Sequence, residues 1–80
     1  MGDKLRRRAA LHLASECGEL TQAIVKWLQD PSRLTRYNVE MEAGDVLALI
    51  DLLREQGVIR NEQVHDRQQE KLENYRRKYG

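Results

Sequence analysis

The sequence predicts an all-α protein, a helical bundle of about three helices per chain that oligomerisation completes. Apolar residues recur every three or four positions along most of the chain, which is the period of a helix that buries one face. No stretch of useful length shows the alternation of apolar and polar residues that is typical of a strand. Pro31 and Gly57 interrupt the helical pattern and divide the chain into helical segments.

The composition indicates one small soluble domain over residues 1–80. The chain has no Phe and one Trp, so we expect a thin aliphatic core that a second chain helps to bury. The formal net charge of +1 argues against a dedicated nucleic-acid binder. No apolar run is long enough to span a membrane, and the single cysteine, Cys17, excludes an intrachain disulfide framework. We therefore expect a cytoplasmic protein.

The first helix is expected to run from Asp3, as its N-cap, to about Gln29, where Asp30-Pro31 ends it. Its apolar stripe holds Leu13, Cys17, Leu20, Ile24, Trp27 and Leu28. The stripe one residue further around the helix holds His12, Glu16, Glu19, Ala23 and Lys26. Two carboxylates one turn apart thus lie directly against the face that should be buried, and Cys17 is interpreted as a small buried hydrophobe. Because Gly18 adds a cost of about 1 kcal/mol relative to Ala, either the helix is poorly built or a cation lies between it and its neighbour.

The second helix, expected over residues 36–56 after a loop at 30–35, repeats this arrangement. Its apolar stripe holds Val39, Ala43, Val46, Ile50 and Leu53. The adjoining stripe holds Asn38, Glu42, Asp45, Leu49 and Leu52. Gly44 precedes the second acid, as Gly18 does in the first helix. Gly57 is expected to end the helix in a left-handed conformation, with Val58 placed against Leu53 as in a Schellman motif.

Antiparallel packing of these two helices, which their short connection favours, would bring four carboxylates to one seam. Two unit charges about 4 Å apart repel by about 4 kcal/mol at an effective dielectric constant near 20. Four ionised acids therefore need a counter-charge. Since oxygen ligands suit hard cations, the pattern points to Mg²⁺, or Mn²⁺, rather than zinc.

The third helix is expected over residues 62–78, with Asn61 as its N-cap. One face holds His65, Gln68, Leu72, Tyr75 and Tyr79. Only the second half of that face is apolar, so this helix needs more than its own chain to hold it in place. Leu5, Leu11 and Leu47 also lie off the main apolar stripes. We therefore predict a homo-oligomer, either a dimer or a tetramer.

Two motifs support a resemblance to a known family. Glu16-Cys17-Gly18-Glu19 and Glu42-Ala43-Gly44-Asp45 resemble the ExxE…ExxD signature of the MazG-like all-α nucleoside triphosphate pyrophosphatases. The surrounding segments, ECGELTQAIVKW and EMEAGDVLALIDLL, look like the first and second core helices of that group. The resemblance is good over residues 12–56 and looser over the third helix.

The resemblance implies hydrolysis of a (d)NTP between its α and β phosphates, which gives a nucleoside monophosphate and pyrophosphate with Mg²⁺ as cofactor. Carried over by position, Glu16, Glu19, Glu42 and Asp45 would be the metal ligands and catalytic residues. The family also carries a Lys and an Asn near the chain end, and their nearest matches are Lys71 and Asn74. The sequence leaves open whether the enzyme acts on normal nucleotides or removes modified ones.

Several side chains have two interpretations each. Lys26 either neutralises phosphate or extends its charge into water, and Trp27 either stacks on a base or belongs to the core. Asn38 either reads the nucleoside or belongs to the helix start. Glu16 or Glu19 would take the proton of the attacking water. The remaining candidates are His12, interpreted as a hydrogen-bonded interface residue, and for triphosphate contacts Arg36, Arg67 and Lys71.

The competing hypothesis is a non-enzymatic helical oligomer or nucleic-acid adaptor. The basic residues at 6–8 and 76–78 would then form its phosphate-binding surface, and the acids would be solvated. There is no Gly-rich phosphate loop, which excludes a P-loop NTPase.

Overall fold

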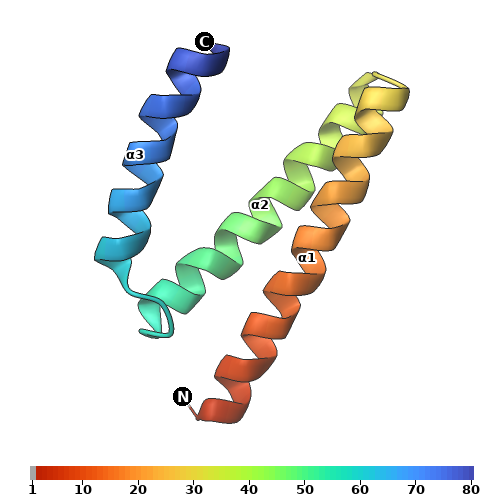
Figure 1. Ribbon diagram of the computed structural model, residues 1–80. Coiled ribbons are helices and arrows are strands. Elements are labelled where there is room, and N and C mark those ends of the chain that lie inside the picture. The colour runs from red at the N-terminus through yellow and green to blue at the C-terminus, as the bar shows by residue number, and fades with distance from the viewer. Residues whose placement is uncertain (1) are drawn as a thin grey trace.

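The computed structural model describes residues 2–80, and these form the helices α1 (Asp3–Gln29), α2 (Arg33–Glu55) and α3 (Asn61–Tyr79). Helices α1 and α2 pack side by side as an antiparallel hairpin, whereas α3 leaves the hairpin at a corner and is splayed away from it (Figure 1). No strand occurs within the described part of the chain. The all-α prediction, with its helical segments, is therefore confirmed.

The hairpin turn is shorter than predicted, because α2 begins at Arg33 rather than near residue 36. Ser32 is the N-cap, and its side-chain oxygen accepts a hydrogen bond from the backbone N–H of Thr35 at 3.1 Å. In return, the Thr35 hydroxyl accepts from the backbone N–H of Ser32 at 2.9 Å. This is a capping box in which Thr replaces the usual Glu or Gln, and so the prediction placed the whole segment in the loop.

The two N-caps predicted from the sequence, Asp3 and Asn61, are wrong. Asp3 lies inside α1, whose N-cap is Gly2, and the carboxylate of Asp3 pairs with Arg6 at 3.9 Å. Asn61 is the first residue of α3 and not its cap. Its amide oxygen instead accepts hydrogen bonds from the guanidinium group of Arg54, which joins α2 to α3.

The predicted Schellman motif at the end of α2 is confirmed. Gly57 has a φ of 71°, a left-handed conformation that favours glycine. The N–H of Val58 donates to the carbonyl oxygen of Leu53 at 3.0 Å, and the N–H of Gly57 donates to that of Arg54 at 3.1 Å. This turn, together with the Arg54–Asn61 hydrogen bonds, sets the direction in which α3 leaves the hairpin.

The core is as thin as the composition predicts, because only Ala23, Val46 and Leu53 are buried among the described apolar residues. The apolar stripe predicted for α2 is buried or half-buried throughout its length. On α1, Leu13 and Leu20 are half-buried, but the other residues predicted for its apolar stripe are exposed, and these are Cys17, Ile24, Trp27 and Leu28. The prediction of a buried Cys17 is thus wrong.

Cys17 is exposed because α1 is rotated slightly about its axis, relative to the orientation that the predicted apolar stripe implies. The side of α1 that faces α2 lies between the two predicted stripes. Its less exposed residues are Leu13, Glu16, Leu20 and Ala23. The carboxylate of Glu16 is therefore drawn into the helix–helix contact. In exchange, Cys17 and Ile24 are turned away from α2 and remain exposed in the single chain.

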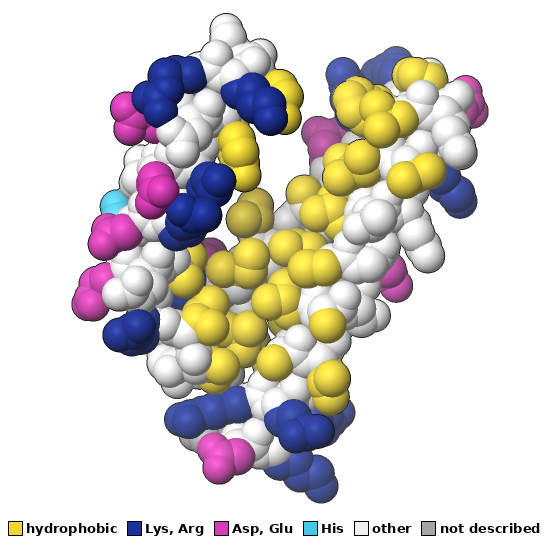
Figure 2. Space-filling view, viewed as in Figure 1, with side chains coloured by type: hydrophobic (Ala, Val, Ile, Leu, Met, Phe, Trp, Pro, Cys, Tyr) yellow, Lys and Arg dark blue, Asp and Glu magenta, His cyan; other side chains and the backbone are white. Residues whose placement is uncertain are grey.

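A broad apolar surface remains uncovered in the single chain. Figure 2 shows apolar side chains gathered over the side of the hairpin that faces α3 and along the inner side of α3. No residue of α3 is buried, and the face predicted for it packs only in part, since Leu72 is half-buried while Tyr75 and Tyr79 are exposed. Over residues 2–80 no helix combines the length and the hydropathy needed to cross a membrane.

Replacing Gly18 with Ala is expected to raise the free energy of unfolding by about 1 kcal/mol, because Ala has the higher helix propensity. A Cβ atom built at Gly18 meets no other atom within 4 Å, so the methyl group has room. The matched control is Gly57→Ala, which should lower stability because φ is positive there. Chemical denaturation of the two variants measures both effects. Lower stability of Gly18→Ala would contradict the prediction and would mean that another chain approaches the helix at this point.

Candidate metal site

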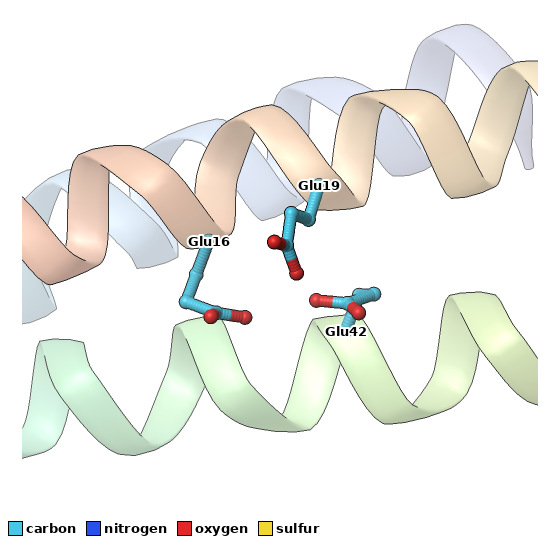
Figure 3. A group of neighbouring side chains, drawn as sticks. All are labelled: Glu16, Glu19 and Glu42. Carbon is cyan, nitrogen blue, oxygen red and sulfur yellow. The ribbon is translucent and has the colours of Figure 1, made fainter.

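Three of the predicted carboxylates meet at the centre of the hairpin. Glu16 and Glu19 project from successive turns of α1, and Glu42 projects toward them from α2 (Figure 3). One carboxylate oxygen from each residue can be chosen so that all three atoms lie within 4.8 Å of one another. The antiparallel hairpin therefore brings together three of the four carboxylates that the paired motifs place at one seam. We call Glu16, Glu19 and Glu42 the carboxylate cluster.

The cluster is partly withdrawn from water, and no Lys or Arg of residues 2–80 forms an ion pair with it. The side chain of Glu16 is only 13% exposed. Its Oε2 atom and that of Glu42 are buried, and neither accepts a hydrogen bond from an N–H or hydroxyl group within the described part of the chain. The Lys and Arg ion pairs of residues 2–80 all involve other acids. Buried acceptors without donors are costly, and an all-oxygen donor set of this kind fits a hard divalent cation.

The pKa of Glu42 reports the same crowding. A hydrogen bond with the carboxyl group of Glu16 raises the pKa of Glu42 from 4.5 to about 7. Burial and the negative charges of Glu16, Glu19 and Asp45 act in the same direction. Without a cation, Glu42 therefore keeps its proton up to neutral pH. A cation that displaces this proton would relieve the repulsion among the three carboxylates.

Asp45, the fourth predicted ligand, lies one turn further along α2. Its charge is near enough to raise the pKa of Glu42, but its carboxylate is not one of the three that converge. It lines a hollow of about 300 Å³ together with His12, Glu16 and Leu49. This places Asp45 at the edge of the cluster, and its role as a ligand stays a prediction.

A second hollow, of about 240 Å³, opens on the other side of the cluster. Its lining joins the two helices and consists of Glu19, Gln22, Ala23, Lys26, Asn38, Met41 and Glu42. The structure thus brings Lys26 and Asn38 beside the carboxylates, as their positions on the two acidic stripes predict. Gln22 and Met41 were missed, although the period of the helix gave a signal, since Gln22 lies one turn after Glu19.

The other predicted substrate residues lie elsewhere. Lys71 and Asn74 are on α3 and line neither of these two hollows. The ammonium group of Lys71 lies 5.6 Å from the ring centre of Tyr75, and the amide oxygen of Asn74 accepts a hydrogen bond from Arg77. Trp27, near the end of α1, is 38% exposed and also lines neither hollow. The roles assigned to these three residues stay predictions.

Fold and site together define a class of protein, an all-α chain in which a helical hairpin presents a carboxylate cluster suited to a divalent cation. The family is then given by comparison of the sequence with family profiles. The profile of the MazG nucleotide pyrophosphohydrolase domain matches residues 4–79, and the chain belongs to this family. The resemblance stated from the two acidic motifs is thereby confirmed. Comparisons with curated proteins and with solved structures gave no match.

Proposed function

We propose that this protein is a Mg²⁺-dependent pyrophosphohydrolase that converts a (d)NTP into a (d)NMP and pyrophosphate. Membership of the MazG family supports a nucleotide pyrophosphohydrolase. The single observation that carries the proposal is the convergence of three carboxylates from two helices within 4.8 Å. A polyphosphate chain is strongly anionic, so a carboxylate site can accept it only together with cations.

The residues of the carboxylate cluster would hold Mg²⁺, with Asp45 as a further ligand at its edge. A bound divalent cation supplies charge neutralisation at the phosphate oxygens and a lowered pKa for water. Glu16 or Glu19 takes the proton of the attacking water as its oxygen bonds to the α-phosphorus. The bond between the α-phosphorus and the bridging oxygen breaks, and pyrophosphate leaves.

The hollow beside the cluster is the proposed place for the substrate. Lys26 lies there next to Glu19 and Glu42, so its ammonium group can meet phosphate charge that the cation leaves unpaired. Asn38 supplies an amide that both donates and accepts hydrogen bonds to a sugar or a base. The remainder of the base site, including Trp27, Lys71 and Asn74, would come from other parts of the assembled protein.

A nucleotide panel tests this function. The purified protein is incubated with each common dNTP and NTP with added Mg²⁺, and phosphate is measured after inorganic pyrophosphatase is added. We expect release from at least one nucleotide, its loss with EDTA, and a monophosphate as the second product. If a panel that includes modified nucleotides yields no pyrophosphate with either Mg²⁺ or Mn²⁺, the proposed function is wrong.

The competing adaptor hypothesis gains no support from the fold. The two termini lie at opposite ends of the molecule (Figure 1), so the basic residues 6–8 and 76–78 do not form one surface within a chain. We propose that the protein works in the reducing cytoplasm, where its single cysteine, Cys17, stays a free thiol.

We further propose that the protein works as a homo-oligomer in which a second copy covers the apolar surface between the hairpin and α3. Leu28 and Leu47 are 65% and 60% exposed in the single chain, and α3 has no buried residue of its own. On α1, the exposed Cys17 and Ile24 lie on one side of the line that faces α2, while Glu19 lies on the other. A second copy can therefore cover the apolar side and leave the carboxylates accessible.

Replacing Leu47 with Lys is expected to shift the protein toward the monomer, because the new charge would be buried at the contact between copies. The matched control is Leu34→Lys, which changes an equally exposed leucine about 140° around the same helix. Sedimentation velocity over a range of concentrations measures both variants, and circular dichroism monitors their helix content. An unchanged assembly in Leu47→Lys, or equal dissociation in Leu34→Lys, would contradict the assignment of this face.

A further inference from the structure

His12 makes the one ion-pair contact that reaches the carboxylate cluster from outside it, among the ion pairs that residues 2–80 form. It lies one turn before Glu16 on α1, and its Nε2 atom is 3.3 Å from Oε1 of Glu16. The two side chains differ in environment, because that of His12 is 61% exposed and that of Glu16 only 13% exposed. One end of the contact is therefore in water and the other is inside the site.

This contact occupies one oxygen of Glu16 and leaves the other available. Oε1 lies 3.3 Å from Nε2 of the imidazole, while Oε2 is buried and accepts no hydrogen bond from an N–H or hydroxyl group of the described chain. A Glu side chain has three rotatable bonds, and freeing or fixing them changes how well it serves as a ligand. An N–H donor at Oε1 would hold the carboxylate in one orientation and would present Oε2 in a fixed position.

We propose that His12 is a positioning residue of the metal site, which donates a hydrogen bond from Nε2–H to Oε1 of Glu16 and thereby orders that carboxylate for a divalent cation. The inference rests on the proposed metal-dependent function, to which it adds a residue outside the acidic motifs. Hydrogen-bond partners of metal ligands typically contribute about 10- to 100-fold to metal affinity.

Two other roles for His12 fit the geometry less well. It is not among the residues whose ligand atoms lie within 4.8 Å of one another, and hard Mg²⁺ prefers oxygen ligands to an imidazole. A pair of solvated side chains one helical turn apart would contribute only to helix stability. That role does not fit well, because the Glu16 carboxylate is mostly withdrawn from water and belongs to the cluster.

Direct metal binding tests the proposal without relying on catalysis. Mn²⁺ is titrated into the full-length protein without nucleotide, and free Mn²⁺ is measured by electron paramagnetic resonance. We expect His12→Leu to weaken Mn²⁺ binding by about 10- to 100-fold. His12→Gln should restore most of the affinity, because the Gln amide can donate to Glu16 and is a poor ligand itself. The matched control is His65→Leu, which removes an exposed histidine on α3 and should leave the affinity unchanged.

The outcomes separate this inference from the proposed function. If wild-type protein binds Mn²⁺ and releases no pyrophosphate from any nucleotide, the function fails while the affinities of the His12 variants still decide the positioning role. Unchanged affinity in His12→Leu overturns the inference even if the wild type is active. Equal losses in His12→Leu and His12→Gln, with thermal melts like that of the wild type, also overturn it, because hydrogen-bond donation would then not be what matters. Absence of Mn²⁺ binding by the wild type overturns it together with the metal site.

Discussion

Replacing Glu42 with Gln is expected to lower the rate of pyrophosphate release by about 10³-fold or more. A metal ion contributes several kcal/mol of transition-state stabilisation, and each 1.36 kcal/mol corresponds to about a tenfold change in rate. Glu42 is the only carboxylate that α2 contributes to the carboxylate cluster. Its loss would leave Asp45, at the edge of the cluster, as the one proposed ligand from α2, and would thus weaken the link between the two halves of the site.

The same substitution should leave the fold intact, which separates a ligand from a structural residue. Gln has the shape of Glu but no charge, so it removes part of the repulsion that raises the pKa of Glu42. We expect the metal-free variant to melt at or above the wild-type temperature at pH 8. The control is Glu55→Gln, which changes an exposed acid at the end of the same helix and should keep full activity. Retained turnover in Glu42→Gln would contradict the ligand assignment.

The hairpin and the cluster were largely predictable because they depend on local periodicity. The spacing of Glu16, Glu19 and Glu42 against the apolar residues placed the acids beside the helix contact, and the short turn made the helices antiparallel. The helical period of the apolar residues could not fix the orientation of α1 about its own axis more finely than one residue position. That rotation decides whether Glu16 or Cys17 enters the contact, and the structure selects Glu16. The choice depends on packing against α2, which no local pattern encodes.

The third helix shows where a single sequence stops being informative. Its ends were predicted closely, since Gly57 and the polar residues at 60–62 mark the corner. Its position relative to the hairpin was not predictable, because it depends mainly on the corner, where the Schellman motif and the hydrogen bonds between Arg54 and Asn61 join α3 to α2. Lys71 and Asn74 depend on that position. Their roles can be assigned only once the surroundings of α3 in the assembled protein are known.

The affinity for Mg²⁺ is expected to rise about tenfold for each pH unit between pH 5 and 7, about 100-fold in total, and to level off above pH 7. The cause is the proton on Glu42, whose pKa is raised to about 7 by the hydrogen bond with Glu16, by burial and by the neighbouring charges. A cation needs this carboxylate ionised, so below pH 7 it must displace one proton. Isothermal titration calorimetry at pH 5, 6, 7 and 8 measures the affinity, and buffers of different ionisation enthalpy give the number of protons released.

The contribution of Glu42 to the stability of the metal-free protein should fall, rather than rise, as the pH increases. Because the folded-state pKa is raised above 4.5, Glu42 binds more proton in the folded than in the unfolded chain between pH 4.5 and about 7. Its contribution to stability is thus complete below pH 4.5 and is lost as the pH rises through about 7, and added Mg²⁺ should restore it. Glu42→Gln removes the titrating group and should flatten both profiles between pH 5 and 7. An affinity that is independent of pH over this range in the wild type would mean that the cation binds without displacing the proton, and that Glu42 is therefore not its ligand.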